Sequence, residues 1–213
     1  MTEIYYNAKE VENLSWSDIV FWNAGINSEG LRVIIGDSVE RIPAGLFYRC
    51  TSLISVDVPN SVTSVEEYAF YGCTGLTSVT IPDRVTSIGK SAFYGCTGLT
   101  EVYYNAREAE DLQYGVFRNA GISSGGCQVI IGDSVERIPS NLFNSCTGLA
   151  GVTVGSGATS IGDGAFKSCT GMTSLTIGSN VTSIGNSAFS GCTGLTEIIY
   201  NARKVSDLDQ STN

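Results

Sequence analysis

The sequence repeats itself with a period of 23 residues. Six of the seven cysteines mark this period, because they form two sets of three at that interval: Cys50, Cys73 and Cys96, then Cys146, Cys169 and Cys192. A unit this short cannot bury its hydrophobic face alone, so it gains stability only by stacking on neighbouring units. The period therefore predicts a solenoid instead of a globular domain.

A second, longer repeat groups these units into modules. Residues 3–100 are repeated by residues 101–196, and a third copy begins at 197 with EIIYNARKVSDL. We predict a single solenoid over residues 1–213 with about nine turns: module one (3–100), module two (101–196) and the start of a third (197–213). The chain begins on a strand and stops within a third long turn, so we expect it to be a fragment of a longer array.

Each unit contains an alternating segment. In one unit Leu76, Val79 and Ile81 are apolar, whereas Ser78 and Thr80 between them are polar, which is typical of a strand with one buried face. Successive strands run in the same direction, so we expect them to pair in parallel about 4.8 Å apart. The motif V-T-S-I-G that follows predicts a second, shorter extended segment on another face.

An Ala-Phe or Leu-Phe pair recurs after the second segment. We expect a single helical turn here, with the phenylalanine filling the wide side of the core and Phe21 and Phe117 taking this role in the long turns. Gly72, Gly95 and Gly191 come just before the cysteine and suit a helix end with positive φ.

The motif A-F-x-G-C-T-G-L-T-S-V-T-I-P, together with V-T-S-I-G, resembles the BspA-type leucine-rich repeats of surface proteins from host-associated bacteria and some protozoa. The long turn YYNAREAEDLQYGVFRNAGI, followed by QVIIGDSVERIPSNLF, is similar to the variant repeat common in clostridial members of that family. The fold class expected is an α/β solenoid: a right-handed leucine-rich-repeat coil with a parallel β-sheet on one face, and short strands and single helical turns elsewhere. The resemblance also implies a secreted or cell-surface protein that adheres to host or bacterial surface molecules.

Composition excludes several other functions. The chain has 12 basic and 21 acidic residues, a net charge of -9, so the clustered basic face that nucleic acid needs is missing. No apolar stretch approaches the roughly 20 residues that cross a bilayer, so no direct membrane insertion is expected, and the N-terminus does not read as a signal peptide. With no histidine, the commonest general base and zinc ligand are absent. We expect no enzyme, no cofactor and no metal site.

Acidic residues and cysteines are the remaining groups with possible chemistry. Glu66–Glu67 and the cluster Glu108, Glu110 and Asp111 could act as paired glycosidase carboxylates, but we predict that they are solvated surface acids. The cysteines are more consistent with buried free thiols than with disulfides, since stacked side chains point the same way and give poor disulfide geometry. Cys127 takes the core slot of Leu31 in module one.

The outer face of the parallel sheet is the candidate binding site, because solenoids use such broad rigid surfaces for recognition. Its apolar and aromatic side chains stand beside charged ones, as interface anchors do. The predicted ligand-binding residues are Tyr5, Arg32, Ile34, Asp57, Thr80, Glu101, Tyr103 and Ile130. The partner expected is a host or bacterial surface protein, with a glycan as the alternative. Two alternatives stay open: these residues serve strand propensity alone, in a structural spacer without a ligand, or the tyrosines make a carbohydrate-binding module. An ice-binding face is disfavoured by the mixed sizes of the outward residues and by Asp57.

Overall fold

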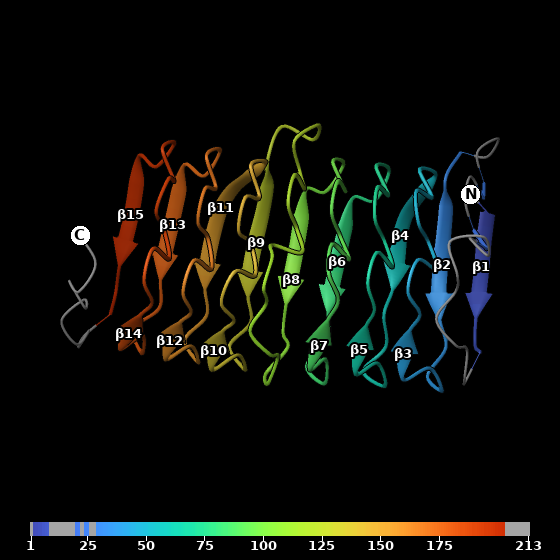
Figure 1. Ribbon diagram of the computed structural model, residues 1–213, viewed down its shortest axis with the longest axis horizontal. Coiled ribbons are helices and arrows are strands. Elements are labelled where there is room, and N and C mark those ends of the chain that lie inside the picture. The colour runs from blue at the N-terminus through green and yellow to red at the C-terminus, as the bar shows by residue number, and fades with distance from the viewer. Residues whose placement is uncertain (1, 9–19, 22–23, 26–28, 203–213) are drawn as a thin grey trace.

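The chain forms an elongated coil in which most strands lie side by side along one axis (Figure 1). The computed structural model describes residues 2–8, 20–21, 24–25 and 29–202. Within these residues, nine strands pair in parallel into one sheet. In spatial order they are β1 (Thr2–Tyr6), β2 (Leu31–Ile35), β4 (Leu53–Asp57), β6 (Ser78–Ile81), β8 (Glu101–Tyr104), β9 (Cys127–Ile131), β11 (Leu149–Val154), β13 (Ser174–Ile177) and β15 (Glu197–Tyr200).

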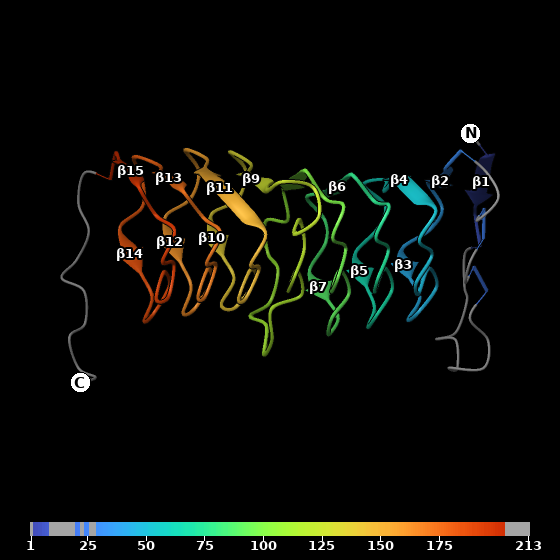
Figure 2. The same cartoon turned by 90° about the horizontal axis from the view of Figure 1, so that it is seen from above.

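Short strands of two residues form a second layer of the coil, away from the long sheet (Figure 2). They come from the predicted second extended segment, whose existence is confirmed. Among the described residues, these short strands form two separate three-stranded sheets. The first contains β3 (Arg41–Ile42), β5 (Ser64–Val65) and β7 (Ser87–Ile88), and the second contains β10 (Arg137–Ile138), β12 (Ser160–Ile161) and β14 (Ser183–Ile184). The interruption falls at the long turn between the two modules.

The register of the long sheet follows the repeat. Tyr5 pairs with Ile34, and Thr80 pairs with Tyr103, which in turn pairs with Ile130. The neighbouring column runs from Glu3 through Arg32 to Ser55, and from Ser78 to Glu101. Paired residues are 23 positions apart in the short turns, but 29 apart from Tyr5 to Ile34 and 27 apart from Tyr103 to Ile130, where the long turns intervene. The register is the same across both kinds of turn, as the sequence pattern predicted.

A stack of phenylalanine rings fills the interior. Phe47, Phe70 and Phe93 are fully buried, and neighbouring rings in the stack lie 4.8–5.5 Å apart, centroid to centroid. The two long turns contribute Phe21, which stacks on Phe47 at 5.2 Å, and Phe117, which stacks on Phe93 at 4.8 Å. The prediction for these two residues is confirmed. Offset stacks of this kind add to the hydrophobic gain of burying each ring.

The predicted helical turns around these phenylalanines are wrong, and with them the α/β class. The described residues contain no helix, and thus none that is long and apolar enough to span a membrane. Instead, the Phe47 N–H donates to the Ala69 carbonyl of the next coil at 2.8 Å, so the backbone bonds that would close a helix join neighbouring coils. Residues with positive φ, such as Tyr68 (58°) and Gly72 (68°), break the segment into successive turns. The positive φ predicted for Gly72 is correct, but it belongs to a turn.

Candidate functional site

The predicted sheet-face residues form two groups on neighbouring strands. The first group lies on β1, β2 and β4 and consists of Tyr5, Arg32, Ile34 and Asp57. The Arg32 guanidinium donates to Asp57 Oδ2 at 2.6 Å and to Glu3 Oε1 at 3.2 Å, so it links three strands. Tyr5 is 65% exposed beside it, whereas Ile34 is half-buried. This arrangement presents one fixed cation between two carboxylates, with an aromatic ring nearby.

The second group lies on β6, β8 and β9 and consists of Thr80, Glu101, Tyr103 and Ile130. The Tyr103 hydroxyl donates to Glu101 Oε2 at 3.1 Å, and this hydrogen bond raises the pKa of Tyr103. Tyr103 is 37% exposed, and its column neighbours are Thr80 and Ile130. The ring is therefore held by its hydroxyl while the face of the column stays open to a partner.

Beyond its first strand, β8, the sheet face of module two carries smaller and neutral side chains. The column that holds Arg32 and Glu101 continues with Gln128, Gly151 and Ser174. A Cβ added at Gly151 would meet the Gln128 side-chain oxygen and, at 2.8 Å, Ser174 Oγ, so the Gln128 side chain lies over the glycine. The column becomes charged again at β15, where Ser174 pairs with Glu197, so the predicted site on β1 to β9 is separated from β15 by a neutral stretch on β11 and β13.

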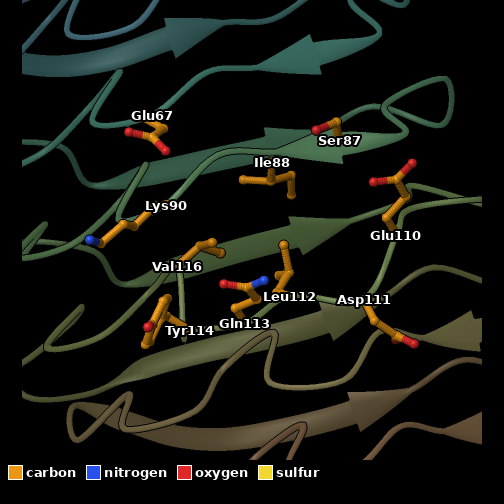
Figure 3. A pocket seen from close by; sticks show the side chains of 10 residues that line it. All are labelled: Glu67, Ser87, Ile88, Lys90, Glu110, Asp111, Leu112, Gln113, Tyr114 and Val116. Atoms are coloured by element: carbon orange, nitrogen blue, oxygen red, sulfur yellow. The ribbon is translucent and has the colours of Figure 1, made fainter.

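A groove that the sequence analysis missed lies at the junction of the modules. It has a volume of about 430 Å³ and opens where the second layer is interrupted, between β7 and the long turn. Its lining consists of Glu67, Ser87, Ile88, Lys90, Glu110, Asp111, Leu112, Gln113, Tyr114 and Val116. Figure 3 shows Ile88, Leu112 and Val116 toward its middle, Glu67, Lys90 and Tyr114 on one side, and Glu110 and Asp111 on the other.

Asp111 fixes the long turn against module two. Its carboxylate accepts hydrogen bonds from the Arg137 guanidinium and, at 2.7 Å, from the Ser140 N–H. These contacts, led by the bond from the Ser140 backbone, lower the pKa of Asp111. Glu67, Glu108 and Glu110 are exposed, as predicted for surface acids, whereas Glu66, for which the same was predicted, is half-buried. The carboxylates of Glu67, Glu110 and Asp111 nevertheless share one groove, which the sequence did not reveal because Glu67 is more than 40 residues from the others.

A smaller hollow of about 200 Å³ adjoins the groove, and both are lined by Lys90, Gln113 and Tyr114. Tyr114 is 60% exposed, and the Lys90 ammonium lies 5.5 Å from its ring centroid. Tyr94 lines the smaller hollow and ends a row of stacked tyrosines in module one. In that row Tyr71 lies 5.0 Å from Tyr48 and 4.9 Å from Tyr94, centroid to centroid.

Six of the seven cysteines lie three residues after a stacked phenylalanine, whereas Cys127 lies on β9. The thiols of Cys73 and Cys96 donate to the carbonyls of Phe47 and Phe70 at 3.0 and 3.1 Å. Cys127 is fully buried in the slot predicted for it, and all seven cysteines are free thiols, Cys192 being the half-buried member. Burial raises the pKa of Cys96 and of Cys127 to about 12. These thiols act as small core residues, as predicted.

Comparison with known proteins identifies the repeat. The family model described as the BspA type leucine rich repeat region (6 copies) matches residues 20–125 and 125–212, which is most of the chain. No curated protein sequence matches the chain.

Two solved structures support the fold, with TM-scores of 0.51 and 0.50. A leucine-rich repeat protein from Treponema pallidum matches with a TM-score of 0.51 and 22% identity, over 92% of this chain and 72% of the other. The pneumococcal vaccine antigen PcpA matches with a TM-score of 0.50 and 18% identity, over 93% of this chain and 56% of the other. A leucine-rich cell-surface protein from Faecalibacterium prausnitzii has 27% identity and a TM-score of 0.37, over 81% of this chain. This chain spans 60% of that protein's length.

Proposed function

The chain belongs to the BspA-type leucine-rich repeat family, and from this premise we propose that it is a cell-surface recognition module that binds a protein ligand through the outer face of its nine-stranded sheet. The similar proteins support a surface location: the F. prausnitzii protein is described as a cell-surface protein and PcpA as a vaccine antigen. The proposed role is adhesion and not catalysis.

One observation carries the proposal. The two sheet-face groups occupy adjacent strands in parallel register, so charged and aromatic side chains stand in fixed columns, with successive members of a column about 4.8 Å apart. Arg32 is bonded to Glu3 and Asp57, and Tyr103 to Glu101, so these side chains lose little conformational freedom on binding. Tyrosine and arginine are the residues that most often anchor protein interfaces. A spacer without a ligand would not need this preorganisation.

The test uses the chain immobilised and exposed to a panel of extracellular-matrix proteins and bacterial surface polysaccharides. Replacing Tyr103 and Ile130 with serine removes the anchors of the second group, and we expect capture of a bound protein to weaken about tenfold or more. The matched control replaces Thr153 and Thr176 with serine in the same column of module two, and it should bind like the unmodified chain. Equal capture by both variants would move the function to another surface, and capture of polysaccharide alone would favour the carbohydrate-binding alternative. If no form of the chain captures any of these molecules, the alternative of a structural spacer without a ligand is favoured.

A further inference from the structure

The ladder of short strands lacks a rung at the junction groove. Between consecutive short strands, a backbone N–H donates to the carbonyl one turn before: Glu66 to Ile42 at 3.0 Å, Gly89 to Val65 at 2.7 Å, and equivalent bonds reach Ile138 and Ile161 at 2.8 and 2.7 Å. Among the described residues, no backbone hydrogen bond joins Ile88 to the long turn that follows it. The interruption of the second layer is therefore centred on one residue.

The geometry of the ladder shows where the Ile88 backbone points. In a parallel strand the N–H and C=O of one residue lie on the same edge, and those of the next residue lie on the opposite edge. Gly89 bonds Val65 of β5, so Ile88 directs its N–H and its C=O to the other edge, which faces the groove. A donor and an acceptor on the same residue are thus left at the groove wall, and burying such groups without partners costs free energy.

The long turn creates this gap because its backbone hydrogen bonds switch from module one to module two. The Glu110 N–H still bonds the Thr86 carbonyl of module one at 3.0 Å, but the Leu112 N–H bonds the Ser140 carbonyl of module two at 3.1 Å. Asp111, held by Arg137 and Ser140, lies at the crossing point. The turn therefore leaves β7 just before the position where it would complete the rung on Ile88.

We propose that the junction groove binds an extended peptide segment, which adds to the free edge of β7 and completes the missing rung. A single donor and acceptor spaced as in a parallel ladder match an extended backbone, and this mode of recognition uses such edges. The middle of the groove is apolar, with Ile88 and Val116 almost fully buried and Leu112 half-buried, which suits an aliphatic side chain of the peptide.

The charges of the rim favour a basic peptide. Glu67 and Glu110 face the groove, whereas the charge of Asp111 is neutralised by Arg137 and that of Lys90 lies against the Tyr114 ring. The whole chain carries a net charge of -9, which also attracts a cationic segment. The preferred segment is an aliphatic residue flanked by lysine or arginine. The site contains no residue of the sheet face, so this proposal and the proposed function can be tested independently of each other.

The test is an NMR titration of the full chain with the peptide acetyl-KVTVK-amide. We expect the Ile88 amide signal to shift and its hydrogen exchange to slow, because that N–H gains an acceptor. The same peptide with its three central nitrogens methylated keeps its side chains but cannot form the backbone bonds, so it should bind at least about tenfold more weakly. Chitotriose serves as the carbohydrate probe.

Two protein variants sharpen the result. Glu110→Lys reverses a charge at the groove and should weaken binding of the basic peptide about five- to tenfold. Glu108→Lys makes the same change on an exposed residue two positions away that does not line the groove, and it should alter binding less than twofold. The proposal is overturned if the peptide does not bind, if its methylated form binds equally well, if Ile88 is unaffected, or if chitotriose binds in its place.

Discussion

The inner and outer columns of the turn segment behave differently although they are adjacent in sequence. The inner column is phenylalanine in both modules, from Phe47 to Phe189, and forms one continuous stack. The outer column follows each phenylalanine by one residue: it is Tyr48, Tyr71 and Tyr94 in module one, but Asn144, Lys167 and Ser190 at the corresponding positions of module two. The difference shows which positions the coil itself constrains.

The inner position faces a closed space whose size is set by the neighbouring coils, so one side-chain volume fits every turn. The outer position faces solvent, where many side chains are tolerated and the choice is free to serve recognition. If this distinction holds, changes in the inner column should cost much stability in either module, while exchanges of outer residues between modules should cost little.

The largest effect is expected from Phe117→Ala, which removes an inner ring at the module junction. Phe117 is fully buried between Phe93 at 4.8 Å and Phe143 at 5.0 Å. The loss of its burial and the cavity left behind should lower the free energy of unfolding by about 3–5 kcal/mol. Urea unfolding followed by circular dichroism measures this value. A change below about 1 kcal/mol would mean that the phenylalanine of the long turn does not contribute to the stability of the stack.

The second-largest loss of stability is expected at alkaline pH, where the thiols that are buried in the folded chain ionise on unfolding. Burial raises the pKa of Cys96 and Cys127 to about 12, against about 8.5 for a thiol in the unfolded chain. Because the folded pKa is the higher one, this contribution to stability is complete below pH ~8.5 and is lost as the pH rises toward 12. At pH 10 the loss should reach about 2 kcal/mol for each thiol. Unfolding curves at pH 8 and pH 10 test this, and Cys96→Ala should reduce the difference between them.

A backbone contact gives the third prediction. The glycine of the C-T-G motif packs against the coil before it: a Cβ on Gly98 would overlap the Thr74 carbonyl oxygen, and Gly75 and Gly171 have the same contact with Thr51 and Thr147. Gly98→Ala should therefore lower the free energy of unfolding by about 1–3 kcal/mol.

Gly45→Ala is the control for this contact, because Gly45 has positive φ (66°) but no atom within 4 Å of the added Cβ. Its cost should come from conformation alone, about 1 kcal/mol. If the two variants lose equal stability, close packing of coils is not the reason for the glycine of the C-T-G motif.

The same distinction explains what the sequence could predict. The recurring residue pattern predicts the strands, their register and the inner residues, so the sequence placed Tyr103 and Ile130 in one column and Phe117 in the core even though the long turn adds residues to the period. The helical turns were wrong because the pattern around Phe47 shows only that the ring is buried, while its N–H is bonded to Ala69 of the next coil. The junction groove was missed because it arises where the period fails, at the long turn, and depends on Asp111 bonding toward module two instead of module one.

The smallest effect is expected from Tyr71→Lys. Lysine is the residue found at the corresponding outer position of module two, Lys167. Tyr71 is half-buried and stacks on two tyrosines at 5.0 and 4.9 Å. Stacked aromatic pairs contribute about 0.5–1.5 kcal/mol each where they are desolvated, but here the rings meet solvent and the lysine stem covers part of the same surface. The loss should stay near 1 kcal/mol, well below that of Phe117→Ala, in urea unfolding under identical conditions.

A loss as large as that of the inner ring would show that the tyrosine row is part of the structural core of module one. Module two, which lacks the row, would then need a structural compensation. A small loss would instead leave the row free for a role on the surface, next to the smaller hollow that Tyr94 and Tyr114 line.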